Sequence, residues 1–142
     1  MENKINIGRV ILGGIAGGIV MLAIGFVIHA VLLEEYYVHF QSVGSVLAEP
    51  RPGIGSILMF PITILLGIPL ALLYVLSREH LGAGPKTALI VGFLVGLMGL
   101  SVASAMYSFY NLGRMIPFGM GVDFMLECIG GTLIAGLLYK DK

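Results

Sequence analysis

Four long stretches of apolar residues, separated by short polar segments, dominate the pattern of this chain. They cover residues 10–33, 54–76, 87–107 and 117–139. A helix of about 20 mostly apolar residues can cross the roughly 30 Å of hydrocarbon in a bilayer. The first three stretches contain no Asp, Glu, Lys or Arg, and the fourth contains only Asp123 and Glu127. The pattern therefore predicts an all-α, polytopic membrane protein with four transmembrane helices.

The positively charged residues lie mostly on one side of the predicted bundle. Lys and Arg are enriched in the short cytoplasmic segments that flank membrane spans. Only Arg51 and Arg114 flank the spans on one side. The other side carries Lys4, Arg9, Arg78, Lys86, Lys140 and Lys142. This bias predicts that both termini lie in the cytoplasm and that the longest connection, residues 34–53, lies on the opposite face.

The composition narrows the class of protein further. Only 11% of the residues are charged and the mean hydropathy is +1.00, whereas an ordinary soluble domain has about 25% charged residues. Eight basic and eight acidic residues leave no net charge, which argues against a nucleic-acid partner. The single cysteine excludes an intrachain disulfide and a cysteine-based zinc site. We expect one compact four-helix transmembrane domain over residues 1–142, surrounded by membrane lipids and without a cofactor.

Small residues spaced four apart indicate where membrane helices pack closely together. Gly14 and Gly18 form such a pair in the first stretch, and helical spacing extends their face to Gly25 and His29. We therefore expect His29 on the packed side of its helix. Gly92 and Gly96 form the corresponding pair in the third stretch. In the fourth stretch one line of residues joins Gly119, Asp123, Glu127, Gly131 and Ala135.

The two acids within the fourth stretch are the main candidates for a functional site. An acid at the centre of a membrane helix costs about 2.5–3.5 kcal/mol on insertion scales. Asp123 and Glu127 are one helical turn apart and repel each other, so at least one should be protonated unless a cation lies between them. No Lys or Arg lies inside any stretch. The candidate site for an ion, a proton or a partner comprises Asp123, Glu127, His29, Ser101 and Ser104. At about 1.5 Å per residue from the midpoint of each stretch, all five lie at the centre or in the outer half of the membrane, so we expect a polar pocket that opens outward.

Each of these residues also has a structural interpretation. The acids can serve as protonated hydrogen-bonding groups between helices, and His29 as a satisfied interface histidine. No nucleophile with a base, no catalytic acid pair outside the membrane and no metal-binding motif occurs in the sequence. We therefore expect no enzyme activity, no catalytic residue and no metal site.

Two functions remain open. The lack of an internal counter-charge favours a protein that acts by helix association, as an accessory subunit of a larger membrane complex or as a homo-oligomer. The alternative is a small cation- or proton-coupled transporter, with Asp123 and Glu127 as the coupling acids and His29 as a gate or relay. Four helices are few for a permeation path, so the transporter would also need a dimer.

The segment that ends the first stretch is distinctive. It contains Gly25-Phe26, His29 and the pair Tyr36-Tyr37, and three further spans follow it. This layout resembles small bacterial inner-membrane protein families that have four helices and no assigned function. The resemblance implies a multi-pass protein of a bacterial inner membrane and implies no particular activity.

Overall fold

The structure, a computed structural model, describes residues 5–49 and 51–139. Within these ranges the chain is helical and contains no strand. Its elements are α1 (Ile7–Val27), the π-helical turn η1 (Ile28–Leu32), α2 (Glu34–Ser42), α3 (Ile54–Leu81), α4 (Pro85–Phe109) and α5 (Met115–Leu138). Four segments are long and apolar enough to cross a membrane: Ile7–Leu32, Ile57–Leu81, Pro85–Phe109 and Met115–Leu138. The prediction of an all-helical chain with four long apolar helices is confirmed.

The helices extend beyond the apolar stretches from which they were predicted. α3 continues past residue 76 to Leu81, because charged residues such as Arg78 and Glu79 are also good helix formers. It ends at Gly82, whose φ of 84° lies in the left-handed region that glycine adopts without strain. α4 then begins with Pro85 in its first turn, a position where the missing proline N–H costs no hydrogen bond.

The connection predicted over residues 34–53 contains a helix that the apolar pattern did not reveal. α2 begins with Glu34 and Glu35 in its first turn, where negative charge is stabilised by the helix dipole. Leu33 separates α2 from η1, with a φ of −105° and a ψ of 3°. The chain therefore changes direction at Leu33 rather than continuing as one straight helix.

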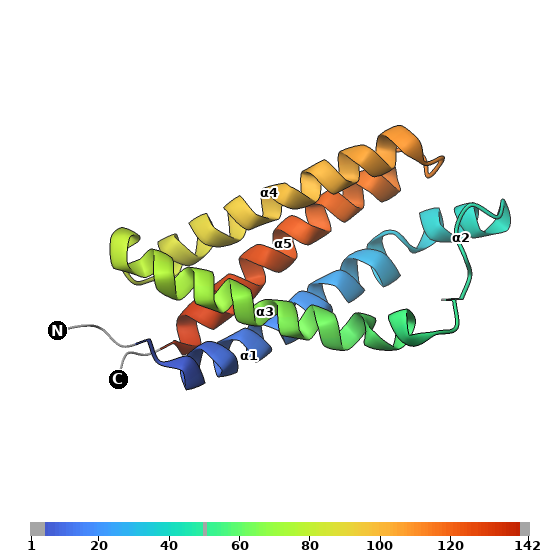
Figure 1. Ribbon diagram of the computed structural model, residues 1–142. Coiled ribbons are helices and arrows are strands. Elements are labelled where there is room, and N and C mark those ends of the chain that lie inside the picture. The colour runs from blue at the N-terminus through green and yellow to red at the C-terminus, as the bar shows by residue number, and fades with distance from the viewer. Residues whose placement is uncertain (1–4, 50, 140–142) are drawn as a thin grey trace.

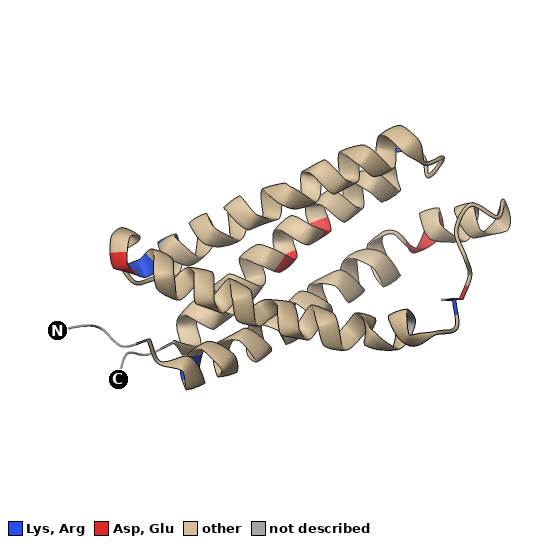
Figure 2. Cartoon of the chain, in the orientation of Figure 1, with Lys and Arg blue, Asp and Glu red and all other residues tan. Residues whose placement is uncertain are grey.

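Figure 1 shows that α4 and α5 lie side by side, while α1 packs against both α3 and α5. The start of α1, the turn between α3 and α4 and the end of α5 lie at one end of the bundle, which we call the closed end. α2 and the connection between α4 and α5 lie at the opposite end. Figure 2 shows acidic positions within the middle of α5, whereas the other charged positions lie near helix ends or in connections.

The closed end is filled by an apolar cluster. It consists of Val10, Ala71, Tyr74, Val75, Ala88, Ala135 and Tyr139. The hydroxyl of Tyr139 accepts a hydrogen bond from the Asn6 N–H at 3.1 Å, and the hydroxyl of Tyr74 accepts one from the Gly84 N–H at 3.2 Å. These contacts tie the beginning and end of the bundle together and leave this end tightly packed.

The glycines of α1 contact two different helices in turn. A Cβ on Gly14 would lie 2.5 Å from the Ile68 Cα of α3, and a Cβ on Gly18 would overlap the Ile64 carbonyl oxygen. Gly25 instead faces α5, where a Cβ would meet the side chain of Glu127. The face predicted to join Gly14, Gly18, Gly25 and His29 thus packs on α3 near the closed end and on α5 farther along.

The seam between α4 and α5 is also made close by glycine. A Cβ on Gly92 would lie 2.6 Å from the Ile129 Cα, and one on Gly96 would lie 2.8 Å from the Met125 Cα. Gly131 of α5 faces α1 instead, where a Cβ would lie 2.9 Å from the Met21 Sδ. One side of α5 therefore packs on α4, and another side packs on α1.

Candidate functional site

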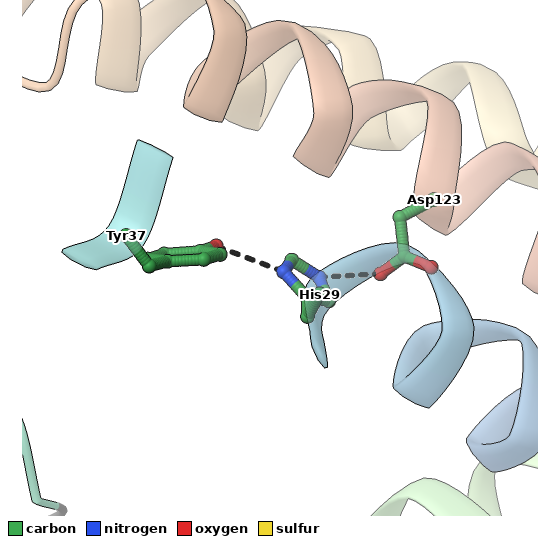
Figure 3. Close-up of polar contacts among 3 residues, drawn as sticks. All are labelled: His29, Tyr37 and Asp123. Carbon is green, nitrogen blue, oxygen red and sulfur yellow. Dashed lines mark hydrogen bonds and ion pairs between the residues drawn. The ribbon is translucent and has the colours of Figure 1, made fainter. Parts of the chain in front are cut away.

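His29 and Asp123 are in direct contact between α1 and α5. His29 is the second residue of η1, immediately after α1, and its Nε2 lies 2.8 Å from Oδ2 of Asp123 (Figure 3). Asp123 is 7% exposed, and the His29 side chain is 34% exposed. The two residues are 94 positions apart in the chain. The fold therefore joins a buried acid to a titratable ring within two of the apolar helices.

Tyr37 of α2 contacts the other nitrogen of the same ring. Its hydroxyl lies 2.8 Å from Nδ1 of His29, so the ring lies between Tyr37 and Asp123 (Figure 3). On a continuous helix, eight residues would separate Tyr37 from His29 by about 12 Å along the axis. The helix is interrupted at Leu33 between the two residues, and the hydroxyl lies within hydrogen-bonding distance of the ring.

The local backbone at His29 is unusual. η1 is a π-helical turn, in which the Leu33 N–H donates to the Ile28 carbonyl at 2.9 Å. A π turn accommodates one more residue than an α turn and so rotates the side chains that follow it. Such turns are rare and frequently occur at functional sites.

Tyr37, His29 and Asp123 form a chain of hydrogen bonds that can persist when the His29 ring gains a proton. In the neutral ring, the Tyr37 hydroxyl donates to Nδ1 and the Nε2–H donates to an ionised Asp123. When the ring is protonated, Nδ1–H donates to the Tyr37 oxygen, and the Nε2–H still donates to Asp123. Only the Tyr37 hydroxyl hydrogen has to rotate between the two states. The arrangement is therefore suited to taking up and releasing a proton at His29.

The environment of Tyr37 keeps its hydroxyl protonated. Burial raises the pKa of Tyr37 above its ordinary value of 10.0, and the negative charge of Asp123 raises that pKa further. Tyr37 therefore remains a neutral phenol across the physiological range and can donate to His29. The sequence placed Tyr37 only in a connection, because nothing in the apolar pattern indicates the turn at Leu33.

Glu127 lies one turn from Asp123 on the same side of α5. Its Oε1 approaches the position that a Cβ on Gly25 would occupy, and Oδ1 of Asp123 lies near the same position. Oδ1 is buried and has no hydrogen-bond partner within residues 5–49 and 51–139. The structure thus brings together His29, Asp123 and Glu127, three of the five residues expected to form the polar site.

Ser101 and Ser104 do not join this group. Both are exposed on α4, and the Ser101 hydroxyl donates to the Met98 carbonyl of its own helix at 2.7 Å. Ser104 lines a separate cavity of about 520 Å³ between α4 and α5, together with Tyr107, Arg114 and Phe118.

The geometry of α5 explains why Ser101 and Ser104 lie apart from the two acids. Gly121 and Met125, two residues before and after Asp123, both face α4. Successive helical residues are about 100° apart, so a separation of two residues places Asp123 on the side of α5 away from α4. Helical spacing alone could not tell which neighbour each face of α5 would meet.

The site contains few groups of the kind that hold transition metals. Among the described residues, no group of three or more His, Cys, Asp and Glu side chains is placed to bind a metal ion. Cys128 follows Glu127 in α5, and it is buried with 1% exposure next to Met21 and Leu70. The imidazole of His29 and the carboxyl groups of Asp123 and Glu127 are suited to proton transfer and to binding small cations.

A scan against protein-family models and searches of curated proteins and solved structures found no match to this chain. The resemblance to small bacterial membrane protein families therefore stays a prediction.

Proposed function

We propose that this chain is a small, non-enzymatic multi-pass membrane protein that takes up and relays protons at the His29–Asp123 pair, as the proton site of a transporter. Four helices apolar enough to span a membrane support the membrane setting. The observation that carries the proposal is the 2.8 Å contact between Nε2 of His29 and Oδ2 of Asp123. Titratable residues in membrane helices are costly and commonly belong to proton or ion paths.

The second candidate function, association with a partner, loses part of its support. It was favoured because Asp123 and Glu127 had no counter-charge within the chain, and His29 is now a direct partner of Asp123. A different observation favours a homo-oligomer. The first turns of α3 are exposed on all sides, with Ile54 75% and Ile57 73% exposed. A second copy of the chain would cover this surface and provide the additional helices that a permeation path needs.

The orientation of the protein is also part of the proposal. Arg9, Arg78 and Lys86 lie at the closed end of the bundle, whereas Arg51 and Arg114 lie at the opposite end. The excess of basic residues supports a cytoplasmic closed end, and the bacterial inner membrane is the setting that the resemblance noted above implies. Lys4, Lys140 and Lys142, which contribute to the same bias, lie outside the described residues. In this orientation Tyr37 lies toward the outer surface.

Proton movement into vesicles tests this function. The purified chain is reconstituted into liposomes that contain NaCl, KCl and a pH-sensitive dye. The outside pH is then lowered, with valinomycin and KCl on both sides to hold the membrane potential at zero, so that protons are driven inward whether or not a cation moves out in exchange. We expect the unmodified chain to move protons. We expect Asp123→Asn to slow the movement by about a hundredfold, a loss typical of removing a proton-transfer group. The amide of Asn has nearly the same shape as the carboxylate, so the exchange mainly removes the charge.

A matched control uses the serine that the structure places away from the site. Ser101→Ala changes an exposed hydroxyl of α4 that contacts only its own helix, and it should leave the rate unchanged. The proposal is wrong if liposomes with the unmodified chain move protons no faster than empty liposomes. Equal rates for Asp123→Asn and the unmodified chain would also contradict it.

A further inference from the structure

The Asp123 carboxylate has a second oxygen that the contact with His29 does not use. Oδ2 faces His29, whereas Oδ1 is buried and lacks a hydrogen-bond partner in the part of the chain that the structure describes. A buried oxygen left without a partner costs about 1–3 kcal/mol, and more when it is charged. An unpaired, buried carboxylate oxygen therefore indicates that something else binds there.

Gly25 lets the side chain of Glu127 lie directly against α1, beside this oxygen. A Cβ at Gly25 would lie 2.5 Å from Oε1 of Glu127 and 3.8 Å from Oδ1 of Asp123. The first distance is too short for any real contact, so no residue other than glycine fits here without moving Glu127. Two carboxylate oxygens thus converge on one point of α1 that carries no side chain.

The charges around this point favour a cation. Two carboxylates face it, and the groups that approach them from α1, η1 and α2 are His29 and, through His29, Tyr37. No Lys or Arg lies in residues 10–33 or 117–139.

The donors also limit which cation fits. They are oxygens only, which suits hard cations rather than transition metals. Within the described ranges of the chain, no group of three or more His, Cys, Asp and Glu side chains is placed to hold a metal ion, whereas a divalent ion usually has six or more oxygen ligands. A singly charged, small cation needs fewer carboxylates and is the better fit.

We propose that Oδ1 of Asp123 and Oε1 of Glu127 bind Na⁺ between α1 and α5, at a position that the absence of a side chain on Gly25 allows Glu127 to reach. This site deepens the proposed function and rests on it in one respect: the Na⁺ and the proton on His29 share the carboxylate of Asp123, so Na⁺ is the ion coupled to proton movement. Asp123 accepts from His29 through one oxygen and binds the cation through the other.

Thermal unfolding in detergent tests the site directly. Cys128 is the only cysteine and is buried, so a thiol-reactive dye reports unfolding of the full chain. The midpoint is measured in NaCl, KCl and choline chloride at equal ionic strength. A ligand that binds only the folded state raises the midpoint as its concentration rises. We expect NaCl to raise the midpoint by several degrees relative to choline chloride, and KCl to raise it less.

Three variants separate the site from general effects on stability. Gly25→Ala and Glu127→Gln should lose the difference between NaCl and choline chloride, whatever their midpoints in choline. Gly8→Ala, in the first turn of the same helix, meets only the Asn6 side chain at 3.7 Å and should keep the full difference. Equal midpoints of the unmodified chain in all three salts would overturn the site. A full Na⁺ response in Gly25→Ala would overturn it as well.

The two proposals fail separately. A Na⁺ response without proton movement in liposomes would leave the cation site standing and contradict the proton relay. Proton movement without a Na⁺ response would leave the proton relay standing and contradict the cation site, because the unfolding assay depends on no transport step.

Discussion

At the scale of single residues, the site depends on two carboxylate oxygens and two ring nitrogens with different partners. One chain of hydrogen bonds runs from the Tyr37 hydroxyl through the two nitrogens of His29 to Oδ2 of Asp123. Oδ1 of Asp123 remains for a separate ligand. Tyr37 therefore helps Asp123 to hold the ring of His29 in place, although it belongs to a helix outside the four apolar segments.

The raised pKa of Tyr37 predicts how the protein behaves at alkaline pH. Burial and then the charge of Asp123 raise this pKa in the folded state, so the folded protein holds the phenol proton more tightly than the unfolded chain. The resulting stability is fully present below pH 10 and is lost as the pH rises through the folded-state pKa. Absorbance near 295 nm, which follows phenol ionisation, should therefore show a late step that Tyr37→Phe removes.

Tyr36 provides the matched control for this titration. It precedes Tyr37 in α2 and is 40% exposed, and Tyr36→Phe should leave the late step in place. If Tyr37→Phe removes only an early-titrating phenol, the contact with His29 does not persist in the protein.

At the scale of helices, close glycine contacts decide how α1 crosses its neighbours. Gly14 and Gly18 contact the backbone of α3, and Gly67 of α3 in turn contacts the backbone of Gly14 and Gly18. The three glycines let the two helix backbones touch. Since α1 also carries His29, the position of α1 between α3 and α5 fixes where the ring meets Asp123.

Gly18→Ala should therefore destabilise the bundle. The added methyl would overlap the Ile64 carbonyl oxygen of α3, which cannot move without displacing the helix. Overpacking of this kind costs about 1–3 kcal/mol, and the midpoint of thermal unfolding should fall by several degrees. Gly55 lies in the first turn of α3, where an added Cβ meets no atom within 4 Å. Gly55→Ala should therefore leave the midpoint unchanged or raise it. Similar losses in both variants would argue against the close crossing.

The pattern of apolar residues predicted the four long helices and the two acids in α5, but it could not predict which side chains meet at the site. The four apolar helices and the unusual acids Asp123 and Glu127 are visible in the sequence, because hydrocarbon demands long apolar runs and penalises charge. Ser101 and Ser104 were grouped with the acids by their depth, yet depth does not determine which helix a face meets. Tyr37 was missed because its contact depends on a change of chain direction at Leu33 that no apolar periodicity encodes.

At the scale of the whole molecule, the two ends of the bundle differ. The polar site reaches Tyr37 at one end, whereas Met21, Leu70 and Cys128 form a buried apolar cluster on its other side. Beyond them the closed end is filled around Tyr74. Within residues 5–49 and 51–139, the chain of hydrogen bonds that starts at Tyr37 ends at Asp123, so a proton that enters there finds no continuing chain of hydrogen bonds in this conformation. Transport across the membrane then requires a second conformation in which the closed end opens, as in alternating access.

The shared carboxylate predicts an exchange between the two ions. A proton on His29 and a Na⁺ at Oδ1 would both lie against Asp123, so each should weaken the binding of the other by the same factor. Adding NaCl to the protein in weakly buffered detergent should release up to about one proton per chain, as cation binding commonly displaces protons. A pH-sensitive dye measures the release, with choline chloride as the control for ionic strength. His29→Gln should keep the Na⁺-dependent rise in unfolding midpoint and release fewer protons than the unmodified chain, because only the carboxyl groups of Asp123 and Glu127 can then lose one. A Na⁺ response in the unmodified chain without proton release would show that the two ions bind independently.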